Sequence, residues 1–321
     1  MSKGDINMVL LVDEQLQVMS SSGNWREYLS LCKRHNMIPV EYVKYLSDTY
    51  NFTLNWLNAV LVFKPNDKFS DFTFLSGVSL PYVEELKTIY YIDHNKDISS
   101  IDNYGAFSIK GLNNIDLPSL FRIDLASGKQ SLEDMAYLRS NSLRVLSIRG
   151  DLQSLPSLDL PILDLILKSS STIELNILNS SKLENLALLS LVYPNISIKD
   201  TDLDWRKFPE LQQLTIRSLQ YDCMNYMILG KEANTLSCLK HLNIRNCSVS
   251  VISPVCLKAL RHVWIEVVCL DDILNLTTPK ASEIYIYTHT ESDLGRSREL
   301  LYSLDAPRES YLSIVFIGDS L

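Results

Sequence analysis

One apolar pattern returns along most of the chain and constrains its fold more than any other feature. From about residue 117, the order apolar-x-x-apolar-x-apolar recurs, and most intervals between copies fall in the range of roughly 20 to 29 residues. The clear copies are Leu120, Ile123, Leu125; Leu143, Leu146, Ile148; Ile162, Leu165, Leu167; Leu183, Leu186, Leu188; Leu211, Leu214, Ile216; Leu239, Leu242, Ile244; and Leu260, Val263, Ile265. Weaker copies are Leu86, Ile89, Tyr91; Ala281, Ile284, Ile286; and Leu312, Val315, Ile317.

Each copy has the alternation of a short strand with one buried face. Its last two apolar residues are separated by one position, so both point inward while the residues between them point out. One such unit cannot enclose a core, but stacked units bury a continuous one. The 53 leucines among 321 residues fit a core that is repeated many times. The sequence therefore predicts a stack of parallel strands.

One unit carries a longer motif. Residues 239–247, Leu-Lys-His-Leu-Asn-Ile-Arg-Asn-Cys, read LxxLxLxxC. This resembles the cysteine-containing leucine-rich repeat of many eukaryotic F-box proteins, in which the cysteine fills the inward corner after the strand. The resemblance implies an α/β leucine-rich-repeat solenoid of about 9–10 repeats over residues 81–321, with a curved parallel sheet on the concave face and helices and loops on the convex face. Other units depart from it, with Gly150, Leu219 and Val268 near the corner.

Residues 1–80 have a different pattern, which predicts a helical unit. Asn24 and Glu27 have the spacing of a capping box, Pro39 suits the first turn of a second helix, and a third helical stretch is expected at 54–62. Such a unit can cap the open end of a repeat stack. The run Leu31-Cys32-Lys33-Arg34-His35 is also similar to a run common in F-box motifs, although the usual Leu-Pro-x-Glu opening is absent. That second interpretation implies a Skp1-like adaptor bound through residues 1–80.

Two return segments between strands, at 131–140 and 254–260, have the apolar spacing of short amphipathic helices. The segment 152–161 contains Pro156 and Pro161, which favour an irregular path. The convex side is therefore expected to mix short helices with loops.

Composition and charge exclude several classes of protein. Hydrophobic residues make up 46% and charged residues 21%, too apolar for disorder. A net charge of -8 makes general binding to nucleic acid or an anionic membrane improbable. The start of the chain lacks the features of a signal peptide, and the longest apolar runs are too short to span a bilayer. Six cysteines without a CxxC pair suit a reducing compartment, the cytoplasm or nucleus.

A search for catalytic and cofactor motifs returns little. The five histidines form neither HExxH nor HxH, and the ten glycines form no phosphate loop. No GxSxG elbow is present. We therefore expect no enzyme activity, cofactor or metal; Cys32 is the one candidate nucleophile outside the repeats for a ligase-type enzyme.

The outward strand positions give a candidate binding face. Four cations fall at the same place in four strands, aromatic side chains lie beside them, and two histidines occupy equivalent places in consecutive repeats. Arg, Trp and Tyr are the residues most enriched at binding hot spots. The alternatives are that the cations only keep the sheet soluble and that residues 293–321 cover the tyrosines. The predicted site residues are Arg149, Lys168, Arg217, His241, Arg245, His262, Trp264, Tyr285 and Tyr287.

These features predict a protein-recognition module that holds a protein partner, with an acidic or phosphorylated segment crossing the cations. By resemblance, its most concrete form is the substrate-receptor subunit of an SCF-type ubiquitin ligase. A scaffold or adaptor of a nuclear or chromatin-associated complex is one alternative. A pathogen effector with leucine-rich repeats is another.

Overall fold

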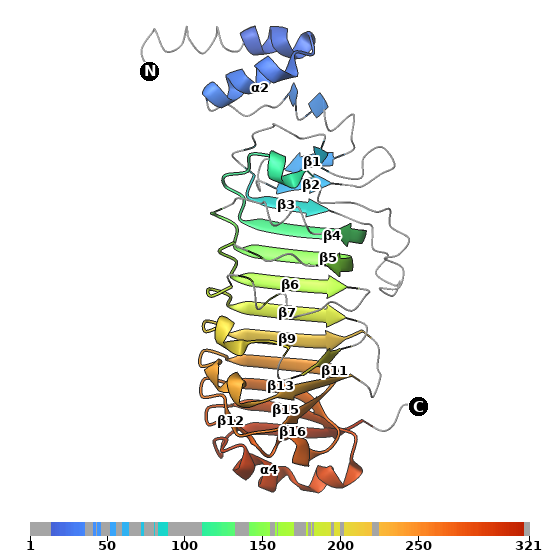
Figure 1. Cartoon of the computed structure of the whole chain (residues 1–321), viewed down its shortest axis with the longest axis vertical. Helices are drawn as coiled ribbons and strands as arrows, with labels where there is room; N and C mark the ends of the chain where they lie inside the picture. The colour runs from blue at the N-terminus through green and yellow to red at the C-terminus, as the bar shows by residue number, and fades with distance from the viewer. Residues whose placement is uncertain are drawn as a thin grey trace.

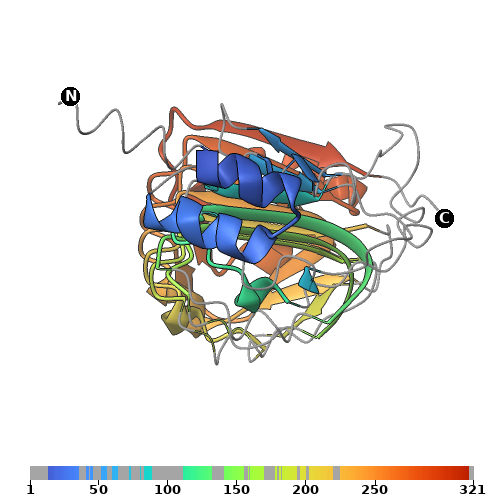
Figure 2. The same cartoon turned by 90° about the horizontal axis from the view of Figure 1, so that it is seen from above.

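The computed structural model describes residues 14–35, 41–42, 44–45, 52–55, 60–63, 72–73, 80, 83–88, 111–131, 141–154, 158, 160–169, 178, 181, 183–193, 196–199, 202–219 and 225–317. Their main feature is one long sheet whose strands follow each other in space in nearly the same order as in the sequence (Figure 1). Seen along the stack, successive strands overlie one another (Figure 2). The predicted α/β stack of parallel strands is confirmed.

The stacked strands are parallel from β2 onward, and only β1 and β2 pair in the antiparallel sense. In order across the sheet they are β1 (Phe52–Asn55), β2 (Val60–Phe63), β3 (Glu85–Thr88), β4 (Arg122–Ser131), β5 (Val145–Ser154), β6 (Asp164–Ser169), β7 (Leu188–Tyr193), β9 (Gln213–Ser218), β11 (His241–Val251), β13 (His262–Val267), β15 (Glu283–Thr288) and β16 (Tyr311–Phe316).

Short elements connect these strands. β8 (Ser197–Ile198) and β10 (Tyr226–Leu229) pair with each other and with the second half of β11, while β12 (Val255–Cys256) and β14 (Leu276–Thr277) form a separate parallel pair. The 3-10 helices are η3 (Leu112–Asn114), η6 (Trp205–Lys207), η7 (Lys231–Thr235), η8 (Leu270–Ile273) and η9 (Glu291–Gly295). The α-helices are residues 14–21, α2 (Trp25–Arg34) and α4 (Ser297–Ser303).

The core is a column of apolar side chains that runs through the stack. The first inward position of each strand is in register with the next, from Leu86 in β3 through Leu165 in β6 to Ile284 in β15, and all of these side chains are buried. Burial on both sides by neighbouring units makes each side chain part of a continuous interior. At the last strand, Leu312 and Ile314 are only partly buried, because no described strand follows β16.

In three units the inward strand positions lie three residues away from those that the sequence predicts. In β7 the inward residues are Leu189 and Leu191, which pair with Leu165 and Leu167, so the unit is 186–189–191 and not 183–186–188. In β3 the inward residue is Leu86 at the second position of the pattern, and in β16 it is Leu312 followed by Ile314. Ile89 and Tyr91 lie outside the described residues.

A turn that precedes several strands contributes one more buried apolar residue, and it explains the shift in β7. Leu186 N donates to Leu183 O at 3.0 Å, and the same bond to the residue three positions earlier recurs at Leu211, Leu239 and Leu260. The full buried pattern is therefore apolar-x-x-apolar-x-x-apolar-x-apolar. The shorter motif also fits at 183–186–188 because the outward residue Leu188 is apolar as well.

α2 begins where the sequence predicts, although the predicted capping box is not formed, because Asn24 N donates to Met19 O at 3.0 Å. α2 starts directly after Asn24, whose Nδ2 donates to Glu27 Oε2 at 2.8 Å, while the Asn24 carbonyl oxygen accepts from Tyr28 N at 3.1 Å. Residues 41–42 and 44–45 are helical, but Pro39 lies outside the described residues. These positions agree with a helical start to the chain.

Two predicted helices are wrong. Residues 52–55 and 60–63 form the antiparallel strands β1 and β2, not a helix at 54–62, and β2 continues the sheet into β3. The segment 254–260 contains strand β12 and not a helix. Its backbone amides donate to the neighbouring unit, Val255 N to Asn275 O at 2.9 Å and Leu257 N to Thr277 O at 3.0 Å. Hydrogen bonds to the neighbouring unit therefore satisfy these backbone amides, and no helix is needed to do so. Residues 132–140 lie outside the described part.

Candidate functional site

Four cations occupy one register position across the sheet, as the sequence predicts. Arg149 pairs with Lys168 across β5 and β6, and Arg217 pairs with Arg245 across β9 and β11. The residue of β7 at this position is Val192, which is paired with both Lys168 and Arg217. We call Arg149, Lys168, Arg217 and Arg245 the cation row. Because the inward residues of β7 are Leu189 and Leu191, its outward residues are Leu188, Ser190 and Val192.

The two ends of the cation row are engaged by neighbouring side chains. Arg149 Nη2 lies 3.6 Å from Asp124 Oδ2. At the other end, Arg245 Nε donates to Asn243 Oδ1 at 3.0 Å, and its guanidinium carbon lies 3.8 Å from the centre of the Trp264 ring. That distance is typical of a cation–π contact, which is worth about 0.5–1 kcal/mol at exposed sites. Arg245 is therefore held between β11 and β13.

An aromatic ladder continues from Arg245 toward the C-terminal end of the sheet. The Trp264 ring stacks on Tyr285 with centroids 5.2 Å apart and on Tyr287 with centroids 5.6 Å apart. Tyr285 then contacts Tyr311 of β16 at 5.5 Å. We call Trp264, Tyr285, Tyr287 and Tyr311 the aromatic ladder. The first three are half-buried and Tyr311 is exposed.

The C-terminal segment extends the sheet beside the tyrosines. β16 pairs in parallel with β15, with Tyr285 opposite Ser313 and Tyr287 opposite Val315. Residues 311–316 therefore lie next to β15 in the plane of the sheet, with Tyr311 against Tyr285, while residues 318–321 of the segment lie outside the described part. The sequence-based prediction missed Tyr311 because it placed the inward residues of this strand three positions too late. In the structure Tyr311 lies opposite Glu283.

Two histidines stack on the same face, one strand step from each other. His241 and His262 are register partners, with ring centroids 4.6 Å apart and planes inclined by 2°. His262 Nδ1 lies 3.2 Å from Glu283 Oε2 on the next strand. Burial lowers the pKa of His241, and the positive charges of His262 and Lys240 add to this effect. His241 is thus biased toward the neutral form.

Glu266 is buried at the end of β13, although its strand position predicts an outward side chain. Its Oε2 accepts from Asn246 N at 2.9 Å, and its Oε1 lies 3.0 Å from His289 Nε2. Asn246 has a φ of 53°, in the left-handed region that asparagine tolerates better than most residues. The next residue, Cys247, is buried as the repeat resemblance implies, and burial raises its pKa to about 12, with a smaller contribution from Glu266.

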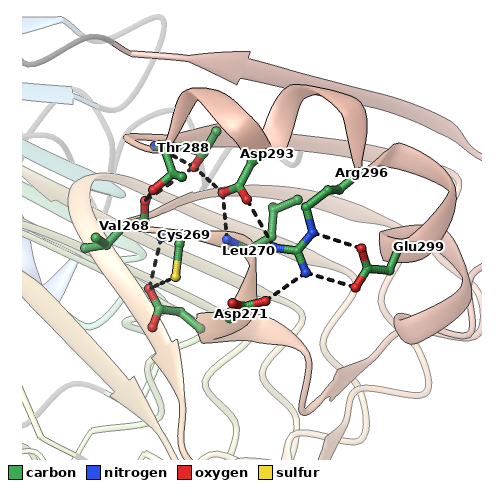
Figure 3. A network of polar contacts seen from close by, with 10 residues as sticks. Val268, Cys269, Leu270, Asp271, Thr288, Asp293, Arg296 and Glu299 are labelled. Carbon is green, nitrogen blue, oxygen red and sulfur yellow. Dashed lines mark hydrogen bonds and ion pairs between the residues drawn. The ribbon is translucent and has the colours of Figure 1, made fainter.

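A buried carboxylate, that of Asp293, joins the end of β15 to η8, the short helix that follows β13 (Figure 3). Asp293 Oδ2 accepts from Leu270 N and from Thr288 Oγ1, both at 2.8 Å. Its other oxygen accepts from Arg296 Nη1 at 3.2 Å. Arg296 also binds Asp271 and Glu299, and these contacts raise its pKa. The sequence contains no local motif for this network, because its residues come from η8, β15, η9 and α4.

The surroundings of Cys32 disfavour a nucleophilic role. The thiol is buried in α2, and burial raises its pKa. A nucleophilic cysteine needs an accessible thiolate.

Within the described ranges, no group of three or more His, Cys, Asp or Glu side chains is placed to hold a metal ion. None of the described helices has the length and apolar character needed to cross a membrane.

Compared with known proteins, the chain matches no protein-family model and has no significant sequence match to a curated protein. The candidate site therefore rests on the geometry of the sheet face alone.

Proposed function

We propose that this chain is a non-catalytic protein-recognition module that binds a protein partner on the exposed face of its sheet. The aromatic ladder is the observation that carries the proposal. It offers a row of stacked rings beside the cation row, and the Asp293 network holds its central strands in place. Stacked aromatic residues and arginines are the side chains that most often dominate binding energy at protein interfaces.

We further propose that the stack is of the leucine-rich-repeat type. Its clear units repeat at the intervals of that family, each contributes one strand to a parallel sheet, and Cys247 is buried within β11, where the register to β13 shifts. Repeat stacks of this kind commonly bind other proteins across the extended surface that their strands create. This supports a binding role for the face.

Comparative capture from cell extract tests the proposal. The parent chain, Trp264→Ala and Tyr302→Ala would each be used as bait, and the retained proteins identified by mass spectrometry. Tyr302 is 90% exposed in α4 and lies outside the ladder, so its substitution controls for the loss of an aromatic ring elsewhere on the surface. We expect a partner that Trp264→Ala loses and Tyr302→Ala keeps. Truncation of a central interface residue costs about 2 kcal/mol or more, roughly a 30-fold loss of affinity. Equal capture by all three would contradict the proposal.

The most specific version of this function is the substrate receptor of an SCF-type ubiquitin ligase. The run that resembles an F-box, residues 31–35, lies at the end of α2, where Leu31 and Cys32 are buried. In this version residues 1–80 bind a Skp1-like adaptor while the sheet face binds the substrate. Size-exclusion chromatography of the full chain mixed with a purified Skp1-like adaptor should give one complex. Separate elution would limit the proposal to recognition through the sheet face, as in a scaffold subunit.

A further inference from the structure

The middle of the cation row carries positive charge that no described carboxylate neutralises. Arg149 is paired with Asp124, and Arg245 lies on Trp264. Lys168 and Arg217, by contrast, form no ion pair with a described residue. They lie on either side of Val192, with Lys168 half-buried and Arg217 exposed. The face therefore presents two available cations separated by one apolar residue.

The local electrostatics favour an added anion at this place. Burial lowers the pKa of Lys168, and the positive charges of Arg149 and Arg217 lower it further. From β5 to β11 the neighbouring row consists of Ser147, Ile166, Ser190, Thr215 and Asn243. The carboxylate of this row, Asp124, lies on β4, where it accepts from Ser147 Oγ at 3.0 Å and pairs with Arg149. The nearest acidic residue on β6, Asp164, lies at the start of the strand, where burial raises its pKa and Arg122 partly offsets this effect.

The distances between these groups set the spacing that the contacting side chains of a bound segment must have. Neighbouring strands lie about 4.8 Å apart, so Lys168 and Arg217, two strands apart, are separated by roughly 10 Å, and Trp264 lies roughly 10 Å beyond Arg217. An extended chain advances about 3.3 Å per residue. A segment that crosses the strands therefore reaches from Lys168 to Arg217 in about three residues and from there to the aromatic ladder in about three more.

We propose that the segment bound on this face is an acidic stretch of protein, with carboxylates at Lys168 and Arg217 and an apolar side chain on the aromatic ladder. This inference rests on the proposed function of the face. Each carboxylate would form a charge-assisted hydrogen bond with an unpaired cation. A nucleic acid fits less well, because a long polyanion meets only this short row and is repelled by the remainder of a chain whose net charge is -8.

Fluorescence anisotropy with a designed peptide tests the inference. The probe is a fluorescein-labelled Gly/Ser peptide with two glutamates about three residues apart and a tryptophan about three residues beyond them. A peptide with glutamine in place of glutamate and an oligothymidylate of similar length serve as comparisons. The proteins are the full-length parent, Lys168→Gln/Arg217→Gln, and a control that removes two exposed charges outside the sheet strands, Lys258→Gln/Lys280→Gln. Circular dichroism would confirm that each variant is folded.

We expect the acidic peptide to bind the parent and the control equally, and the Lys168→Gln/Arg217→Gln variant about tenfold or more weakly at low salt. The difference should shrink between about 50 and about 300 mM NaCl as the charges are screened. Equal binding of the glutamate and glutamine peptides, no binding of the acidic peptide, or tighter binding of the oligothymidylate would overturn the inference. A cellular partner that depends on Trp264 but not on Lys168 or Arg217 would overturn the inference and leave the proposed function standing.

Discussion

Replacing Asp293 with alanine should loosen the C-terminal units that carry the aromatic ladder. Its carboxylate is 1% exposed, and one oxygen accepts from Leu270 N and Thr288 Oγ1. Without it, two buried donors lose their acceptor, at about 1–3 kcal/mol each. The Thr288 hydroxyl has a second acceptor, Val268 O at 3.4 Å, so it can recover a weak bond. We therefore expect the free energy of opening these units to fall by about 2–4 kcal/mol.

Native-state hydrogen exchange measured by mass spectrometry is the suitable assay, because repeat stacks open locally. Amides of residues 262–317 should exchange faster in Asp293→Ala, while those of β5 and β6 keep the parent rates. Asp293→Asn retains one carbonyl oxygen and should have a smaller effect. Asp271→Ala removes an exposed partner of Arg296 and should change little, since surface ion pairs contribute little. Unchanged exchange in Asp293→Ala, or equal effects of all three variants, would refute the reasoning.

Three further predictions follow from the core and the titrating groups. Leu189→Ala should lower the free energy of unfolding by about 2–5 kcal/mol, and Leu188→Ala, on the half-buried face, by less. Urea denaturation measures both, and the reverse order would contradict the assignment of Leu189 as the inward residue. Because the pKa of His241 is lowered on folding, the unfolded chain binds more protons below about pH 6.5 and stability falls as the pH falls. His241→Gln should therefore make stability less dependent on pH between about 7.5 and about 5.5, and an unchanged dependence would argue against a lowered pKa. Cys247, with its pKa raised to about 12, should resist iodoacetamide in the folded chain at about pH 8, whereas the more accessible Cys238 should react; rapid alkylation of Cys247 would show that its unit opens.

The apolar repeat was enough to predict most of the stack and the position of the cation row. Alternation within a strand is a local property, so Leu146 and Ile148 identify their own inward face without reference to a partner. The frame at 183–191 could not be settled in this way. Leu183, Leu186, Leu189 and Leu191 are all buried, and only pairing with β6 shows which two lie in the strand.

The elements that depend on pairing between distant residues were not predictable from local pattern. Residues 54–62 were predicted as a helix, yet residues 52–55 and 60–63 pair as β1 and β2 at the end of the sheet. Glu266 has the sequence position of an exposed side chain, but Asn246 and His289 approach it from neighbouring strands and bury it. In both cases a hydrogen-bonding partner that is remote in the sequence decides the outcome.

The sequence by itself determined that leucines repeat at strand spacing and that arginine, lysine and aromatic residues alternate with them, because side-chain direction within a strand depends only on position along the chain. Only the tertiary structure decided which charges are neutralised. Arg149 meets Asp124 and Arg245 meets Trp264 because register brings separate strands together, and the same register leaves Lys168 and Arg217 on either side of Val192.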